Sequence, residues 1–169
     1  MNMKAALMLL LPFAPLAMEH HGAPAPTMCE EREIVPLPSI WYSAGSDEPL
    51  QDTAWYLEMD GIRSAEDVLG FVKAMMDENT TLILDVEGHA DGFEADFSLL
   101  AQKRADGVVG RLTSLGLPAG RLKAVNKGVD QPRITASKIR LMKSEAEKDK
   151  ARRQNRRVSF RIDSHNWKP

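Results

Sequence analysis

Cysteine, charge of a single sign and long hydrophobic runs are all scarce in this chain of 169 residues. The single cysteine, Cys29, excludes an internal disulfide, and it gives no evidence on the redox compartment. The 22 lysines and arginines nearly balance the 24 aspartates and glutamates, so the formal net charge is -2. This balance provides no general attraction to nucleic acid or to an anionic membrane surface, and neither is predicted as a partner. The length is that of about one domain, which can bury a core without disulfides.

The longest apolar run covers residues 5–17 and follows the positive charge of Lys4. It is shorter than the roughly 20 residues that a membrane-spanning helix needs, and Pro12 and Pro15 interrupt it. A short apolar run between a basic residue and a small residue such as Ala17 is typical of a secretory signal peptide. We therefore predict a cleaved signal peptide over residues 1–17 and no transmembrane segment in the mature chain.

Residues 18–33 contain few large apolar side chains and several Ala-Pro steps. Such a composition cannot pack a core, so a flexible N-terminal tail is predicted. His20, His21 and Cys29 form an incomplete ligand set, and no metal or cofactor is predicted. Because Cys29 follows Pro26-Thr27-Met28 instead of the aliphatic and small residues of a lipoprotein, we expect no lipidation there.

Hydrophobic periodicity predicts alternating strands and helices over the rest of the chain. Ser64 and Asp67 have the spacing of a helix-start motif, whereas Pro36 and Pro38 indicate an edge strand. Residues 50–63 have no clear pattern. The predicted elements are a strand over 34–42, a helix over 64–79, a strand over 82–87, a helix over 98–115, a strand over 121–127, a charged helix or mobile excursion over 137–153, and a strand over 158–162. Their order predicts an α/β two-layer sandwich, a mixed β-sheet with helices packed on one face.

The stretch 82–112 combines a strand, a turn and an amphipathic helix. Its geometry can bring the carboxylate of Asp91, at the strand end, near the guanidinium of Arg104, one to two turns into the helix. Such a pair suits a zwitterionic ligand, with an ammonium on Asp91 and a carboxylate held by Arg104.

Four motifs in this order resemble the OmpA-like C-terminal domain family over about residues 34–162. The family's Gly-His-Thr-Asp at the strand end appears as Gly88-His89-Ala90-Asp91. The matching positions further along are Leu100, Ala101, Arg104, Ala105, Val108, Leu112 and Gly116 in the helix, then Arg121, Gly128 and Pro132, and finally Asn155-Arg156-Arg157-Val158.

The resemblance implies an OmpA-like domain over residues 34–169 that binds peptidoglycan noncovalently in the periplasm and is not an enzyme. Asp91 and Arg104 would grip the diaminopimelate of the peptide stem. Any association with the outer membrane would run through another envelope protein. The chain departs from the family in three places. The interval from Asp91 to Arg104 is short, and Phe97 replaces an asparagine. After the first strand the family's Phe-Asp is replaced by Tyr42-Ser43, so the aspartate is absent.

Two other functions remain open at this stage. A hydrolase could use His89, Asp91 and Glu87, but it would need a third ligand or a nucleophile that the sequence does not supply. A periplasmic protein-interaction module with a degenerate peptidoglycan site is the second alternative. Asp85 and Glu87 are interpreted as solvated residues on one strand face. The arginines at 152, 153, 156 and 157 are a candidate polyanion patch, with Arg157 as a structural residue.

Overall fold

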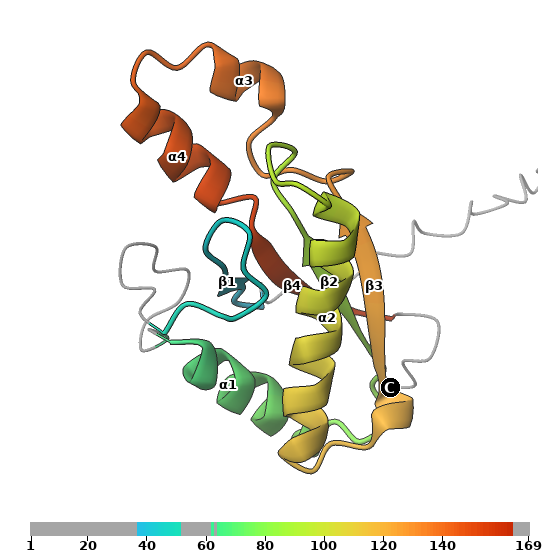
Figure 1. Cartoon of the computed structure of the whole chain (residues 1–169). Coiled ribbons are helices and arrows are strands. Elements are labelled where there is room, and N and C mark those ends of the chain that lie inside the picture. Colours follow the sequence, from blue (N-terminus) through green and yellow to red (C-terminus); the bar gives the residue numbers. More distant parts are fainter. Residues whose placement is uncertain (1–36, 52–61, 63, 164–169) are drawn as a thin grey trace, which may run out of the picture. The chain divides into compact units, whose positions relative to one another are not determined.

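The computed structural model describes residues 37–51, 62 and 64–163. The chain divides into two units, Met1–Ile34 and Val35–Pro169, and all the described residues belong to the second. The predicted signal peptide, tail and histidine pair therefore lie outside the described residues. In chain order the elements are β1 (Ile40–Trp41), α1 (Ala65–Glu78), β2 (Leu84–His89), α2 (Phe97–Ser114), the short 3-10 helix η1 (Ala119–Arg121), β3 (Leu122–Gly128), α3 (Ala136–Arg140), α4 (Glu145–Arg153) and β4 (Arg157–Ile162) (Figure 1).

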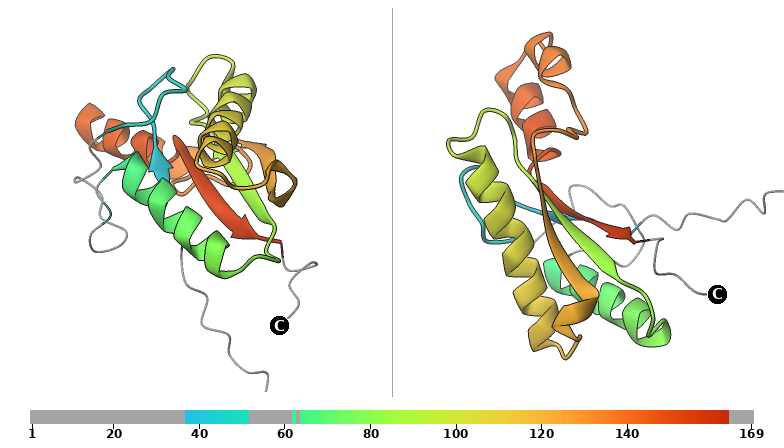
Figure 2. Two further views of the ribbon diagram at one scale, coloured as in Figure 1. Left: turned by 90° about the horizontal axis from the view of Figure 1, so that it is seen from below. Right: turned by 90° about the vertical axis from the view of Figure 1, so that its right-hand side faces the viewer.

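The four described strands form one mixed sheet in the order β1-β4-β2-β3. β2 and β3 are parallel, and α2 provides the crossover between them, as a parallel pair requires. β4 runs antiparallel to both β2 and β1. Helices α1 and α2 pack together against the sheet, which confirms the predicted two-layer α/β sandwich (Figure 2).

Successive side chains of β2 point to opposite faces of the sheet. Leu84 and Val86 are fully buried in the core beneath the helices, with Val72 of α1 and Leu112 of α2. Gly88 continues this face, and a Cβ built on it would lie 1.9 Å from the main-chain oxygen of Ala101 in α2. The helix can approach the strand this closely only because residue 88 has no side chain.

Helix α1 begins where the sequence predicts, because Ser64 forms a capping box. The Ser64 hydroxyl accepts from the amide of Asp67 at 3.1 Å, and the Asp67 carboxylate accepts from the amide of Ser64 at 2.9 Å. These two bonds satisfy main-chain donors that a helix start leaves open. The apolar side then buries Val68, Val72 and Met76 against the sheet.

Two segments differ from the predictions. The first strand is shorter than predicted within the described residues: β1 holds Ile40–Trp41, and beyond it Tyr42 makes an isolated bridge to Pro49. The charged stretch 137–153 is neither one helix nor a featureless excursion. Ser144 forms a second capping box with Glu147, which starts a new helix and separates α4 from α3. No helix within the described ranges is long and apolar enough to cross a membrane.

Candidate functional site

Arg104 lies on the second turn of α2 with no exposed surface. Its guanidinium forks the carboxylate of Glu94, with 2.7 Å from Nη2 to Oε1 and 3.1 Å from Nη1 to Oε2. This two-pronged geometry is the strongest way in which an arginine holds a carboxylate. The partner of Arg104 is therefore Glu94, a residue that sequence reasoning did not single out.

Main-chain oxygens accept hydrogen bonds from the remaining N–H groups of the Arg104 guanidinium. Nε donates to the oxygen of Ser46 at 2.9 Å, Nη1 to that of His89 at 3.0 Å and Nη2 to that of Ser43 at 3.3 Å. Together with the two bonds to Glu94, these use all five N–H donors of the side chain. The ring of Tyr42 lies 5.0 Å from the guanidinium carbon and closes the remaining face. Burial of the charge is thus fully compensated.

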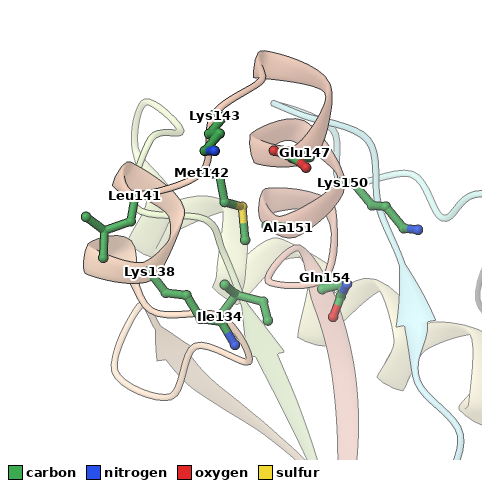
Figure 3. A pocket seen from close by; sticks show the side chains of 9 residues that line it. All are labelled: Ile134, Lys138, Leu141, Met142, Lys143, Glu147, Lys150, Ala151 and Gln154. Atoms are coloured by element: carbon green, nitrogen blue, oxygen red, sulfur yellow. The ribbon is translucent and has the colours of Figure 1, made fainter.

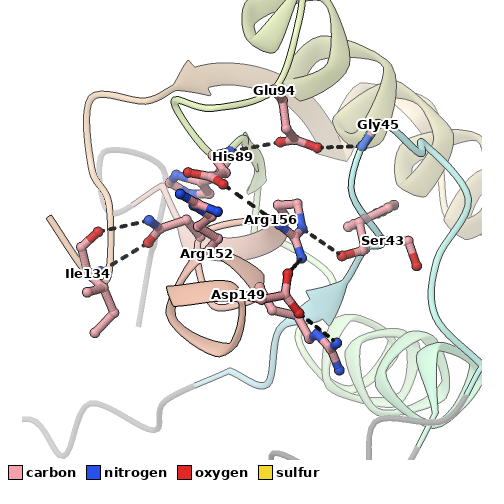
Figure 4. Close-up of polar contacts among 12 residues, drawn as sticks. Ser43, Gly45, His89, Glu94, Ile134, Asp149, Arg152 and Arg156 are labelled. Carbon is pink, nitrogen blue, oxygen red and sulfur yellow. Dashed lines mark hydrogen bonds and ion pairs between the residues drawn. The ribbon is translucent and has the colours of Figure 1, made fainter. Parts of the chain in front are cut away.

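The carboxylate of Glu94 receives two further hydrogen bonds from main-chain amides. Oε2 accepts from the amide of Asp91 at 2.8 Å, and Oε1 accepts from the amide of Gly45 at 2.9 Å (Figure 4). Burial opposes ionisation, but the hydrogen bonds from Arg104, Asp91 and Gly45 outweigh it and lower the pKa of Glu94. Residues 45, 91 and 104 thus converge on one carboxylate, and we call these donors the carboxylate cradle.

Asp91 is also almost completely buried, but its carboxylate faces a different cation. Oδ2 lies 3.7 Å from Nη1 of Arg156, which also ion-pairs with Asp149 at 3.6 Å (Figure 4). Burial raises the pKa of Asp91, and the nearby charge of Arg156 opposes part of that effect. The structure thus brings the amide of Asp91 and the guanidinium of Arg104 to the same carboxylate, that of Glu94, while the Asp91 carboxylate faces Arg156. Among the described contacts, no ion pair joins Asp91 directly to Arg104.

The arginines at the end of the chain are not a uniform basic patch. Arg156 is 4 % exposed and Arg157 7 % exposed, and Arg157 donates to the main-chain oxygen of Gln131. Arg152 stacks 4.2 Å from the ring centre of Phe93, which projects from the loop after β2. The structural role expected for Arg157 agrees with this burial. Arg156, which we expected to be solvated, instead holds Asp91.

The other acidic residues of β2 also differ from expectation. Asp85 and Glu87 share a face, as predicted, but they are nearly buried and not solvated. Arg161 of β4 ion-pairs with both carboxylates, and Lys127 of β3 lies 3.4 Å from Glu87. Basic residues on the neighbouring strands therefore neutralise both carboxylates, and these ion pairs connect β2, β3 and β4.

His89 is buried and hydrogen-bonds through Nε2 to the hydroxyl of Ser159 at 2.8 Å. Burial, followed by the charges of Arg157, Lys127 and Arg133, lowers the pKa of His89 to about 3. Its Nδ1 has no hydrogen-bond partner within the described part of the chain. The described residues also contain no cluster of three metal-ligating side chains.

A surface hollow of about 630 Å³ lies between α3 and α4 (Figure 3). Lys138, Lys143 and Lys150 line it together with Met142 and Glu147. Glu147 belongs to the capping box of α4, so its carboxylate is already engaged. The hollow shares no lining residue with the carboxylate cradle, and we treat it as a separate feature of the surface.

The described residues thus form an α/β sandwich in which Arg104 and two main-chain amides hold one buried carboxylate, that of Glu94, near the end of β2. No protein-family model and no curated protein matches the sequence. Solved structures do match. The peptidoglycan-associated lipoprotein from Burkholderia pseudomallei is 21% identical, with a TM-score of 0.54 over 73% of this chain and 88% of that chain.

The C-terminal domain of Helicobacter pylori MotB is 18% identical, with a TM-score of 0.51 over 79% of this chain and 89% of that chain. The OmpA-like domain of FopA1 from Francisella tularensis is 13% identical, with a TM-score of 0.50 over 73% and 70%. The protein therefore has the OmpA-like fold, as the motifs of its sequence predicted.

Proposed function

We propose that the domain binds peptidoglycan noncovalently in the periplasm and takes up the diaminopimelate of the peptide stem at the carboxylate cradle. One observation carries the proposal: the guanidinium of Arg104 and the amides of Asp91 and Gly45 converge on a single carboxylate. The likeness in fold to a peptidoglycan-associated lipoprotein supports it. The domain would act as a binding module and not as an enzyme.

Two groups of the ligand match the charges around the cradle. The carboxylate of a diaminopimelate side chain would take the position that the Glu94 carboxylate occupies, facing Arg104. Its ammonium would contact the carboxylate of Asp91, which has Arg156 as its charged partner at 3.7 Å. A bidentate guanidinium and an opposed carboxylate select a zwitterion over either charge alone.

Sedimentation with purified, insoluble peptidoglycan tests this function. Asp91→Asn removes the charge for the ammonium, and Arg104→Lys keeps a cation but removes the fork. Loss of one partner of a desolvated charge pair costs about 2 to 5 kcal/mol, so Asp91→Asn should bind roughly 30-fold more weakly or worse. Arg104→Lys keeps its charge but loses the two-pronged geometry, and it should also bind more weakly than the wild type. Lys103→Ala is the matched control, because Lys103 is an exposed neighbour on α2.

Because Arg104 is fully buried, circular dichroism must first show that each variant is folded before its binding is compared. Lys103→Ala should bind within about twofold of the wild type, as a rim charge contributes under about 1 kcal/mol. If Asp91→Asn and Arg104→Lys are folded and sediment as the wild type does, peptidoglycan is not bound at the cradle.

A second candidate is a periplasmic protein-interaction module whose peptidoglycan site is degenerate. The observation in its favour is that Glu94 already fills the cradle, while Asp91 is 2 % and Arg104 0 % exposed. In that case other envelope proteins would be the partners. Failure of both the wild type and a variant without the Glu94 carboxylate to sediment with peptidoglycan would favour this candidate.

A further inference from the structure

We propose that Glu94 is a tethered competitor that occupies the carboxylate position of the cradle until a ligand displaces it. The inference rests on the proposed function, because it concerns the same site. It adds a residue that limits the apparent affinity and decides which ligands can enter. The Glu94 side chain is 3 % exposed, so a ligand carboxylate cannot reach the fork of Arg104 while Glu94 stays in place.

The contacts of Glu94 are those of a bound ligand more than those of a loop residue. Its two oxygens accept four hydrogen bonds of 2.7 to 3.1 Å, two from Arg104 and one each from the amides of Gly45 and Asp91. Gly45 belongs to a segment 49 residues away in the chain. Donors from three segments therefore surround one carboxylate, and that carboxylate is carried by the chain itself.

The loop that carries Glu94 depends on this side chain for its position. The two residues before Glu94 and the two after it are exposed, and Phe93 is 50 % exposed. At the far end of the loop, Asp96 has φ 50° and ψ 38°, a left-handed conformation that L-residues adopt at a cost. Asp96 also makes no side-chain cap to α2. Besides the cradle, the loop is held by the stacking of Arg152 on Phe93 and by the hydrogen bond from the Glu94 amide to the Asp91 oxygen.

The loop has a pivot on each side of Glu94. Ala90 is anchored to β3, since its amide donates to the main-chain oxygen of Gly128 at 2.8 Å. Gly92 follows, and a Cβ there would meet only one atom, at an ordinary distance of 3.8 Å from Val129. Rotation between Gly92 and Asp96 can therefore carry Glu94 outward while Asp91 and Arg104 stay on their strand end and helix.

A tethered competitor sets the minimum affinity that a ligand needs in order to displace it. A group attached through a short loop acts at an effective concentration of about millimolar or more. A ligand with one carboxylate competes poorly, whereas one that also places an ammonium on Asp91 gains a second contact that Glu94 cannot make. When a binding-competent form is only a fraction of the molecules, the apparent affinity falls by that fraction.

Glu94→Gln and Glu94→Ala test the inference in the full-length protein. If the cradle is closed in nine molecules out of ten or more, both variants should bind peptidoglycan about tenfold more tightly than the wild type, or better. Glu48→Gln is the matched control, because Glu48 is an exposed carboxylate of the segment that also carries Gly45, and it pairs with Arg111. That control should leave binding within about twofold.

Acetate provides a second measurement, which does not depend on peptidoglycan. Glu94→Ala leaves the cradle without its carboxylate, so added acetate should raise the melting temperature of this variant in a saturable way. The wild type, whose cradle is filled, should show no such rise, and sodium chloride at equal ionic strength controls for salt.

The outcomes separate this inference from the proposed function. Folded Glu94 variants that bind no more tightly, while Asp91→Asn weakens the wild type, would overturn the inference and leave the function standing. Failure of both Glu94 variants to fold, with or without acetate, would make Glu94 an obligatory structural ion and would also overturn it. If no variant binds peptidoglycan but acetate stabilises Glu94→Ala, the proposed function fails and the cradle remains a carboxylate site of other specificity.

Discussion

Acidification should destabilise this domain through one buried residue, His89. The imidazole is 1 % exposed, and its environment lowers its pKa to about 3, against about 6.5 for an unfolded chain. Between these two values the unfolded state binds a proton and the folded state does not. Stability therefore rises with pH through this window and is lost as the pH falls from 6.5 toward 3.

The size of the effect follows from the two pKa values. At pH 5.0 the unfolded imidazole is almost fully protonated, and linkage gives a loss of about 2 kcal/mol relative to pH 7.5. Because pH 5.0 lies well above the folded pKa, a folded value one unit higher would change this loss by only about 0.1 kcal/mol. The prediction therefore depends on His89 staying neutral in the folded state.

Urea unfolding of the wild type and of His89→Gln at pH 7.5 and 5.0 measures the loss. Glutamine can keep a hydrogen bond to Ser159 but cannot take up a proton. With a urea dependence of about 2 kcal/mol per molar, the wild-type midpoint should fall by about 1 M more than that of the variant. Other titrating groups are common to both proteins, so they cancel.

Two results would contradict this account. One is a pH-dependent loss in the wild type that exceeds that of His89→Gln by less than about 0.5 kcal/mol. The other is an NMR titration in which the His89 ring protonates in the folded protein above pH 5. Either would mean that the folded state accommodates the imidazolium despite its positive neighbours, Arg157, Lys127 and Arg133.

Two further predictions concern packing and export. Gly88→Ala should lower the free energy of unfolding by about 3 kcal/mol or more, because its Cβ would lie 1.9 Å from the main-chain oxygen of Ala101. The control Gly110→Ala, in open space on α2, should be neutral or stabilise by up to about 1 kcal/mol. Equal effects of the two substitutions in urea unfolding would contradict the close contact. We also propose that the native N-terminus directs export, so mass spectrometry of the periplasmic protein should find a chain without residues 1–17, and retention of that segment would refute cleavage.

Local patterns predicted most elements of the fold. The helices at α1 and α2 and the strands at β2, β3 and β4 lie within about two residues of their predicted positions, because hydrophobic periodicity and capping motifs act over neighbouring residues. The break between α3 and α4 was missed, although Ser144 and Glu147 have the capping-box spacing.

The candidate site was predicted less completely. The strand, turn and helix do bring Asp91 and Arg104 into contact with one residue, Glu94, and their role in binding a ligand stays a prediction. Glu94 was overlooked, although an acidic residue three positions after Asp91, in a shortened loop before a helix, was a signal that could have pointed to it. The approach of Arg156, the residue before β4, left no such signal, because it depends on the pairing of β4 with β2.

The sequence by itself determined the α/β class and the order of elements, because backbone propensity and apolar spacing are local properties. Only the tertiary structure decided which charges meet. Arg104 bonds to Ser46, 58 residues away, and Arg156 to Tyr42, 114 residues away. A buried ion needs every donor and acceptor satisfied, and the partners that do so here come from segments whose proximity exists only after the sheet and helices have packed.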